Sequence, residues 1–198
     1  MSESIGVIVL AAGQGSRFRQ FAGGDKDKLL ADCTGRDGAV RSVIEHVLVN
    51  LPANGGKRVL VTTADRPQVI RMAQAYGCEI VLIESIGMGD SIAAGVSACA
   101  QLDGWLMVLG DMPFILILPS SIEKVLAGIS HDSVSVPVQN EEYGHPVGFG
   151  RDFAAGLMAL SEDRGAKPLF AKGRVVEVAV GDPGVLWDVD VPEKLVFK

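Results

Sequence analysis

Six short runs of hydrophobic residues, rich in Val, Ile and Leu, recur along the chain. Most of them lack the polar alternation of a sheet that is exposed on one face. Nearly continuous apolar residues are typical of strands buried on both faces of a parallel sheet. The pattern therefore predicts strands at Ile5–Leu10, Arg58–Thr63, Glu79–Ile83, Trp105–Leu109, Ser133–Val138 and Arg174–Val180.

Between these runs, apolar residues recur at the spacing of a helix with one buried face. Val43, Val47 and Leu51 lie on one such stripe, and Gly77 is a stop signal after another. The predicted helices are Ala39–Leu51, Pro67–Tyr76, Ser91–Leu102, Ser120–Ile129, Phe153–Leu160 and Pro192–Phe197. Strands that alternate with helices predict the α/β class, as a three-layer α/β/α sandwich with a mostly parallel sheet and right-handed crossovers.

The chain shows no repeat, low-complexity tract or linker that would divide it. Residues 1–198 are therefore interpreted as a single domain. Two segments rich in Gly and Asp interrupt the regular pattern: Gly23–Lys28 predicts a mobile loop, and Gly35–Gly38 predicts a turn.

Composition and charge narrow the range of partners. The 198 residues include 18 Lys and Arg against 24 Asp and Glu, which gives a formal net charge of −6. A protein with this balance has no general attraction to nucleic acid or to an anionic membrane, so an anionic ligand needs a local cluster of donors. The chain lacks an apolar run of the ~20 residues that a membrane span requires, and no basic segment precedes the first strand as in a signal peptide. The three cysteines form no CxxC pair, which predicts reduced thiols in a cytoplasmic protein.

The clearest chemical signal directly follows the first predicted strand, where Leu10–Arg17 reads LAAGQGSR. Its glycines let the backbone approach a ligand, and successive amides can form a nest for phosphate oxygens. Arg17 adds a fork of donors suited to a polyphosphate. The segment is neither a Walker A loop, which closes on Gly-Lys-Ser/Thr, nor a dinucleotide-binding GxGxxG turn. By itself it fits a tight turn with a solvated arginine equally well.

Two aspartates stand at positions suited to a metal. Asp111 follows the strand Trp105–Leu109, and ligands of an open α/β sheet bind beyond the carboxyl ends of the strands. Asp190 lies in the sequence WDVDVP, where alternation places it on the same face as Asp188. Mg²⁺ is usually held by one or two carboxylates together with substrate phosphates and waters. Asp111 and Asp190 are therefore candidate ligands, although Asp190 can alternatively cap a helix that opens at Pro192.

With these segments in view, the chain resembles the nucleotidyltransferases of the nucleotide-diphospho-sugar transferase fold, a Rossmann-like α/β fold. The triplet Ala11–Gly13, Ala-Ala-Gly, is closer to their molybdenum cofactor cytidylyltransferase branch than to the guanylyltransferase branch, which more often shows Ala-Gly-Gly. The resemblance extends over nearly the whole chain. Further segments that follow in the family's order are GMGDS at 87–91, LGDMP at 109–113, GHP at 144–146, DRGA at 163–166 and DVDVPE at 188–193.

The resemblance implies a role for individual residues. Arg17, Lys28 and Asp111 are the expected catalytic residues, and Asp111 and Asp190 are the expected Mg²⁺ ligands. The stretch Phe18–Asp27 is longer than in the family, so Lys26 competes with Lys28 for the position of the family's lysine. The expected nucleotide-binding residues are Leu10, Ala11, Ala12, Gly13, Gly15, Ser16, Gly87 and Ser91.

Two further residues are expected to bind the acceptor, namely His145 and Arg164. A lone histidine is often structural, and Arg164 can alternatively pair with Asp163 at the surface. Ser91 can likewise cap a helix instead of meeting the nucleotide base. These alternatives stay open at the level of sequence.

The implied function is transfer of CMP from CTP to molybdopterin that carries molybdenum, with release of pyrophosphate and formation of molybdopterin cytosine dinucleotide. The expected partner protein is a molybdenum hydroxylase or its maturation factor. Rival interpretations keep the chemistry but use GTP or a sugar or polyol phosphate, or make the chain a non-catalytic cofactor-delivery module. A dinucleotide-dependent oxidoreductase is disfavoured because its glycine pattern is missing.

Overall fold

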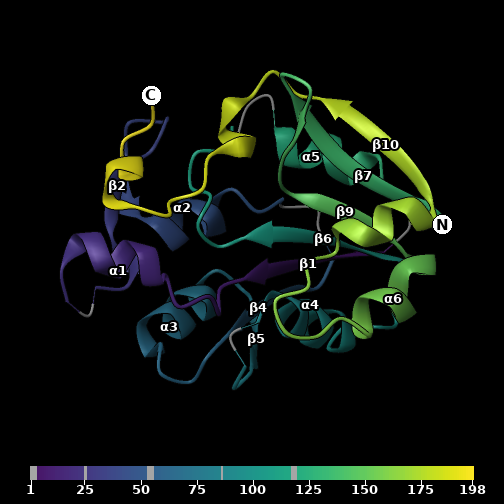
Figure 1. The fold of residues 1–198 in the computed structure, drawn as a ribbon, viewed down its shortest axis with the longest axis horizontal. Coiled ribbons are helices and arrows are strands. Elements are labelled where there is room, and N and C mark those ends of the chain that lie inside the picture. Colours follow the sequence, from purple (N-terminus) through teal and green to yellow (C-terminus); the bar gives the residue numbers. More distant parts are fainter. Residues whose placement is uncertain (1–3, 25, 53–55, 86, 117–119) are drawn as a thin grey trace.

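A computed structural model describes residues 4–24, 26–52, 56–85, 87–116 and 120–198. Most of its strands form one sheet in the order β10-β7-β9-β6-β1-β4-β5, with β8 paired to β7 (Figure 1). A separate antiparallel pair joins β2 (Asp32–Thr34) and β3 (Val40–Ser42). The strands of the large sheet are β1 (Ile5–Leu10), β4 (Arg58–Thr62), β5 (Glu79–Leu82), β6 (Gly104–Leu109), β7 (Ser133–Gln139), β8 (Glu142–Tyr143), β9 (Val147–Gly150) and β10 (Arg174–Ala179).

Helices cover both faces of this sheet, as the alternation along β1 requires. Val7 and Val9 are fully buried against α2, α3 and α5, whereas Ile8 and Leu10 pack against α4 and α6 on the opposite face. The three-layer α/β/α sandwich predicted from the sequence is thereby confirmed. The α-helices are α1 (Ser16–Ala22), α2 (Val43–Val49), α3 (Pro67–Ala75), α4 (Met88–Ser97), α5 (Ser121–Ala127) and α6 (Ala154–Met158).

The prediction of a mostly parallel sheet is confirmed, with one insertion that it did not foresee. β9 runs antiparallel between β6 and β7, in a segment for which the sequence predicts no strand. Two of its four residues are Gly148 and Gly150, and glycine is unfavourable inside a strand. Close packing explains both glycines, because a Cβ at Gly148 would lie 2.4 Å from Ile129 Cγ1 and one at Gly150 would lie 1.8 Å from Ser130 O.

Several predicted element boundaries are wrong. The helix predicted at Ala39–Leu51 begins only at Val43, because residues 40–42 form β3 against β2. The stretch Phe18–Asp27, which is longer than in the resembling family, is partly helical, since α1 extends to Ala22. The C-terminal helix predicted at Pro192–Phe197 is a 3-10 helix, Pro192–Leu195. The predicted cap at Ser120 is confirmed, because its Oγ accepts a hydrogen bond from the amide of Glu123 at 3.1 Å.

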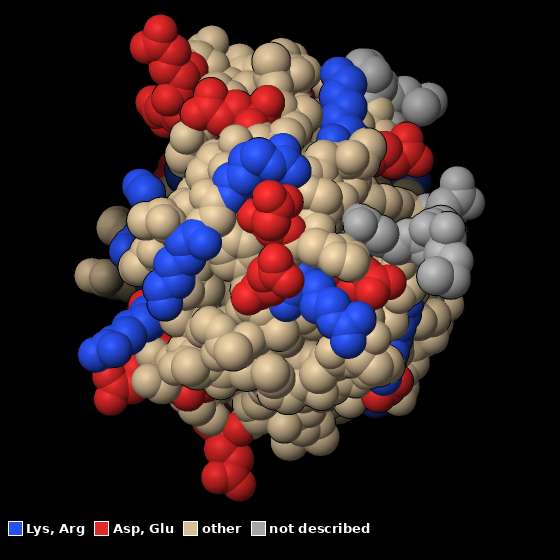
Figure 2. All heavy atoms as spheres, turned by 90° about the vertical axis from the view of Figure 1, so that its right-hand side faces the viewer, with Lys and Arg blue, Asp and Glu red and all other residues tan. Residues whose placement is uncertain are grey.

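The carboxyl ends of β1 and β6 point toward α1 and the C-terminal segment (Figure 1). The opposite side of the molecule faces the viewer in Figure 2, where basic and acidic side chains are interspersed over the surface. Such a face gives no continuous basic track for a polyanion. Among the described residues, no helix combines the length and the apolar character needed to cross a membrane.

The three cysteine side chains, Cys33, Cys78 and Cys99, are all buried and unpaired. Burial raises the pKa of each thiol, and burial together with the charge of Asp32 raises the pKa of Cys33 to about 11. Because the thiolate is the reactive species, we expect the native protein to react with less than one equivalent of Ellman's reagent at pH 8. The same assay in denaturant should report three thiols, and rapid labelling of native protein would contradict the placement of these cysteines.

Candidate active site

The loop that links β1 to α1 is shaped by Gly15. This residue has a left-handed backbone with φ of 63°, and α1 begins at the next residue, Ser16, which is exposed. A Cβ at Gly15 would lie 3.2 Å from the Cγ and Cδ atoms of Lys28. Glycine at this position therefore serves both the turn and the close packing of the Lys28 stem.

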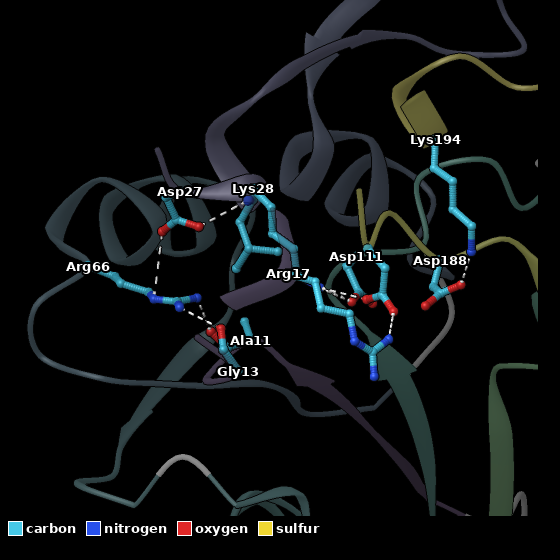
Figure 3. A network of polar contacts seen from close by, with 11 residues as sticks. Ala11, Gly13, Arg17, Asp27, Lys28, Arg66, Asp111, Asp188 and Lys194 are labelled. Carbon is cyan, nitrogen blue, oxygen red and sulfur yellow. Dashed lines mark hydrogen bonds and ion pairs between the residues drawn. The ribbon is translucent and has the colours of Figure 1, made fainter. Parts of the chain in front are cut away.

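Arg66 holds this loop from the start of α3. Its guanidinium is buried and donates hydrogen bonds to Ala11 O at 2.9 Å and to Gly13 O at 2.5 Å (Figure 3). The same group lies 3.6 Å from the carboxylate of Asp27, measured from Nε to Oδ2. Thr62 also donates to Ala11 O, at 3.1 Å. The loop backbone is thus fixed by side chains from β4 and α3.

Lys28 lies at the centre of the site. Asp27 accepts a hydrogen bond from Leu29 N at 3.0 Å and so caps the 3-10 helix Lys28–Leu30. The ammonium of Lys28 donates to Asp111 Oδ2 at 2.5 Å and lies 3.5 Å from Asp190 Oδ1. Lys26, the competing residue, has an exposed side chain. The structure therefore places Lys28, and not Lys26, beside the two predicted metal ligands.

The strand-end segments that carry Asp111 and Asp190 are joined directly. The amide of Val189 donates to Asp111 O at 2.9 Å, and the Val189 side chain is buried. Arg17 donates to Asp190 Oδ2 at 2.6 Å from a largely exposed position. The 3-10 helix at Pro192 has no side-chain cap, so the alternative role of Asp190 as a helix cap is wrong.

Asp188 shares a face with Asp190 but has a different partner. Lys194 donates to its Oδ1 at 2.7 Å (Figure 3). Partial burial alone would raise the pKa of Asp188, but the hydrogen bond and the charge of Lys194 outweigh it and hold the pKa below the ordinary value. Asp188 is therefore a carboxylate anchored by the C-terminal segment.

An ion pair between the exposed residue Arg36 and the buried Asp182 supports these segments from behind. Asp182 is fully enclosed, and its carboxylate accepts hydrogen bonds from Arg36 Nη1 at 2.6 Å, Leu116 N at 2.8 Å and Ser121 Oγ at 2.8 Å. It also accepts from Gly184 N at 3.0 Å. The contacts tie the segment after Asp111 to the 3-10 helix Pro183–Leu186, from which the chain continues to Asp190.

The N-terminus of α4 closes another side of the site. Gly87 precedes this helix, and a Cβ there would lie 2.4 Å from Glu162 O. The Ser91 hydroxyl donates to Gly87 O at 2.9 Å within the helix, so it does not cap the N-terminus. The glycine at 87 therefore lets α4 approach the turn at residues 161–163.

Two cavities adjoin at the carboxyl edge of the sheet and share Leu10, Met88 and Leu109 as walls. The first, which we call the loop cavity, has a volume of about 200 Å³, and the second, the aromatic cavity, about 230 Å³. The loop cavity is lined by Leu10, Ala11, Ala12, Gly13, Lys28, Leu29, Met88, Ser91, Leu109, Asp111 and Asp163. The aromatic cavity is lined by Leu10, Met88, Ile92, Met107, Leu109, Val136, Tyr143, Gly144, His145, Val147, Phe149, Gly165, Ala166, Lys167 and Phe170.

The two residues expected to bind the acceptor lie in different surroundings. His145 lines the aromatic cavity, and its backbone amide donates to Val185 O at 2.9 Å. Burial lowers the pKa of His145, and the charges of Asp111 and Asp188 oppose this only in part. Arg164 is exposed between Asp163, which lines the loop cavity, and Gly165, which lines the aromatic cavity.

The carboxylates of Asp111 and Asp190 are the two oxygen donors that this site offers to a divalent metal. An oxygen of each carboxylate lies within 3.5 Å of the Lys28 ammonium. Within the described residues, no cluster of three or more His, Cys, Asp or Glu side chains could hold a metal. Two hard oxygen donors without a full protein cage suit Mg²⁺, which keeps waters and binds substrate phosphates.

Two supporting residues escaped the sequence analysis, namely Arg66 and Asp182. Both are buried residues that form ion pairs with less buried partners far away in sequence: Arg66 pairs with Asp27, and Asp182 pairs with Arg36. The only local signal is the position of each residue, next to the end of a predicted strand and before a proline.

The sequence profile of the MobA-like NTP transferase domain matches residues 7–178. A bifunctional GlmU protein from Azorhizobium caulinodans is 31% identical over 176 residues, which cover 85% of this chain and 37% of that protein. The chain thus spans little more than a third of the length of the curated relatives it matches.

Solved structures share the fold at low sequence identity. A nucleotidyl transferase from Methanothermobacter superposes with a TM-score of 0.80 at 21% identity, covering 96% of this chain and 94% of that one. A molybdopterin-guanine dinucleotide biosynthesis protein A from Archaeoglobus fulgidus gives 0.62 at 21%, with 96% and 94% covered. A manganese complex of a Mycobacterium tuberculosis protein gives 0.64 at 18%, with 90% and 89% covered.

The support of the loop by Arg66 is open to a direct test. Replacing Arg66 by Met removes two charged hydrogen bonds to the loop backbone and leaves Asp27 without that cation. We expect nucleotide affinity, measured by calorimetry, to fall about tenfold or more. Arg58→Met is the matched control, because Arg58 donates to Tyr76 O and Pro52 O from the amino end of β4, away from the loop. Equal loss of affinity in both variants would refute a specific role for Arg66.

Proposed function

Because the chain belongs to the MobA-like NTP transferase family, we propose that it transfers CMP from CTP to molybdopterin carrying molybdenum and releases pyrophosphate. The family membership supports a nucleotidyl transfer activity. The choice of CTP and molybdopterin as substrates is more specific than the family membership. It is supported by the Ala-Ala-Gly triplet at Ala11–Gly13 and by the order of the further segments that resemble the molybdenum cofactor cytidylyltransferases. We also propose that the enzyme acts in the cytoplasm and delivers its product to a molybdenum hydroxylase or its maturation factor.

The single observation that carries this proposal is the convergence of Lys28, Asp111 and Asp190 at the mouth of the glycine loop. The three side chains come from distant segments of the chain, and both carboxylates lie within 3.5 Å of the Lys28 ammonium. A cation flanked by two carboxylates, beside the backbone amides of the glycine loop, matches the charge pattern of a triphosphate with its metal. The two adjoining cavities supply room for a donor on one side and an acceptor on the other.

In the proposed reaction, the triphosphate binds the backbone amides from Ala12 to Ser16 and the guanidinium of Arg17. A phosphate oxygen of the acceptor attacks the α-phosphorus in line, the bond to the bridging oxygen breaks, and pyrophosphate leaves. Lys28 donates to the phosphoryl oxygens, where negative charge accumulates. Positioning and charge neutralisation therefore account for most of the rate enhancement.

Asp111 and Asp190 would hold Mg²⁺, which neutralises phosphate charge when bound. Nucleotidyltransferases of this fold commonly use a divalent metal, and the Mycobacterium tuberculosis structure named above is a manganese complex. In this chain, Lys28 engages Oδ2 of Asp111, so a metal held by the two carboxylates would compete with the lysine for that oxygen. A lysine displaced from Asp111 would be free to reach the phosphates.

A second candidate acceptor is a sugar phosphate. The resemblance to the nucleotide-diphospho-sugar transferase fold supports it, and GTP is an alternative donor suggested by the molybdopterin-guanine dinucleotide protein. In the proposed sites, the base lies against the N-terminus of α4 near Gly87 and Ser91. The acceptor lies near His145, with Arg164 at the rim.

The proposed function is tested by Mg²⁺-dependent pyrophosphate release from CTP, GTP, ATP and UTP, each with and without a molybdopterin-bearing acceptor. We expect release with CTP only when the acceptor is present. Release with GTP or with glucosamine 1-phosphate as acceptor would move the assignment to a rival substrate. Binding of nucleotide without any release would favour the cofactor-delivery module.

The assignment of Asp111 as a metal ligand is tested with two aspartates that lie at opposite ends of β6. Asp111→Asn keeps the size of the side chain but removes its charge, so we expect turnover to fall about 100-fold or more. The control is Asp103→Asn, because Asp103 precedes β6 at its amino end and pairs with Arg151 and Ser4. Turnover of Asp111→Asn near that of Asp103→Asn would remove Asp111 from the catalytic residues.

A further inference from the structure

One aromatic side chain of the C-terminal segment lies between the two segments that carry the candidate metal ligands. The ring of Phe197 packs against Phe114 with the ring centroids 5.2 Å apart, and against Trp187 with the centroids 5.1 Å apart. Phe114 stands three residues after Asp111, and Trp187 stands three residues before Asp190. Phe197 therefore contacts both segments, each time close to the residue that bears the carboxylate.

Two polar contacts hold the C-terminal segment against the stretch Trp187–Asp190. The indole Nε1 of Trp187 donates to Lys194 O at 2.9 Å. The Lys194 ammonium donates to Asp188 Oδ1 at 2.7 Å (Figure 3). Both bonds join residues 187–188 to the short piece of chain that also carries Phe197. The ring is therefore fixed relative to the backbone that leads to Asp190.

The other side of the ring is tied to the segment that follows β6. Arg36 lies over the ring of Phe197, with the guanidinium carbon 4.6 Å from the ring centre. The same guanidinium donates to Phe114 O at 3.2 Å and to the buried carboxylate of Asp182 at 2.6 Å. Phe114 is itself fully buried in the core. Phe197 thus connects a segment anchored in the core to the segment of Asp190.

The separation of the two carboxylates depends on such support. Asp111 and Asp190 carry like charges, which repel each other, and the ammonium of Lys28 compensates both of them. If a metal displaced this lysine from Asp111 Oδ2, the ammonium would no longer set the separation of the carboxylates. The hydrogen bond from Val189 N to Asp111 O joins the two backbones directly. The aromatic contacts of Phe197 add a second link, which does not depend on charge.

We propose that Phe197 is a positioning residue of the metal site. By packing between Phe114 and Trp187, its ring sets the separation of the carboxylates of Asp111 and Asp190, and with it the affinity of the site for a divalent cation. This inference rests on the proposed function, because it concerns the residues to which that function assigns the metal. It goes further because Phe197 lies beyond residues 188–193, the last of the segments that carry the family resemblance.

A positioning role and a purely structural role predict different results. If the ring of Phe197 only stabilised the fold, its removal would lower the unfolding temperature and leave the metal affinity of the folded protein unchanged. If the ring positions the carboxylates, its removal weakens metal binding in protein that is fully folded. The turnover number then recovers at high metal concentration, because both metal ligands are still present.

The test is binding of Mn²⁺, measured as loss of the EPR signal of the free ion, with and without a non-hydrolysable CTP analogue. Each variant is studied below its measured unfolding temperature. We expect Phe197→Ala to weaken Mn²⁺ binding about tenfold. Phe197→Leu keeps apolar bulk between the two segments and should restore part of the loss.

Phe153→Ala is the matched control. Phe153 is a buried ring that packs against Phe149 and lies beside Gly173, just before the amino end of β10. This end of a parallel strand faces away from the carboxyl edge where the candidate ligands lie. We expect Phe153→Ala to lower the unfolding temperature and to keep the Mn²⁺ affinity of wild type.

Pyrophosphate release gives a second readout. In Phe197→Ala, the Mg²⁺ concentration for half-maximal release should rise about tenfold, while the rate at saturating Mg²⁺ stays within about twofold of wild type. Three outcomes would overturn the inference: unchanged Mn²⁺ affinity in folded Phe197→Ala, equal weakening in Phe153→Ala, or no Mn²⁺ binding by wild type.

The inference and the proposed function can fail separately. Mn²⁺ binding that depends on Phe197, without any CMP transfer to molybdopterin, would uphold this inference and refute the proposed function. CMP transfer to molybdopterin with the same Mg²⁺ dependence in Phe197→Ala and wild type would do the reverse.

Discussion

The ammonium of Lys28, placed against Asp111 and within 3.5 Å of Asp190, joins three parts of the chain at one point. Each partner is positioned by the backbone beside it. Lys28 stands on a short 3-10 helix capped by Asp27, Asp111 follows β6, and Asp190 is linked to Asp111 through the amide of Val189. Because the Lys28 side chain is only 10% exposed, its charge is poorly screened by water, and the two carboxylates are its main compensation. The geometry of the site depends on keeping these three groups together.

Two further ion pairs provide that support from the interior. Arg66 connects the glycine loop to Asp27, and Asp182 connects Arg36 to the segment beyond Asp111. The guanidinium of Arg66 also donates to the backbone carbonyl of Ala11. The carboxylate of Asp182 also accepts hydrogen bonds from the backbone amides of Leu116 and Gly184. Arg36 lies in addition 4.6 Å from the ring centre of Phe197, which draws the C-terminal segment into the same network. Removing Arg36 would leave the buried carboxylate of Asp182 without its cation, which is more damaging than losing an exposed ion pair.

The two cavities differ in chemistry although they share three walls. The loop cavity is bordered by backbone amides, Lys28 and two aspartates, which suits phosphates. The aromatic cavity is bordered mainly by apolar side chains, together with His145 and Lys167. Met88 stands between them at the start of α4, where the glycines at 87 and 89 let the helix pack against the turn at residues 161–162.

The sequence alone determined the α/β architecture, the strands that lie next to the site and the identity of the charged residues at their ends. Buried strands and amphipathic helices leave local periodic signals, and the carboxyl ends of parallel strands meet at one edge whatever the details of packing. The interpretation as a single domain and the roles of Arg17, His145 and Arg164 stay predictions. Tertiary structure alone decided that β9 enters the sheet antiparallel, that Lys28 and not Lys26 faces Asp111, and that Arg66 and Asp182 support the site. These outcomes depend on contacts between residues 39 to 146 positions apart, such as Asp27 with Arg66 and Arg36 with Asp182, and no local pattern of hydrophobic and polar residues encodes such pairings.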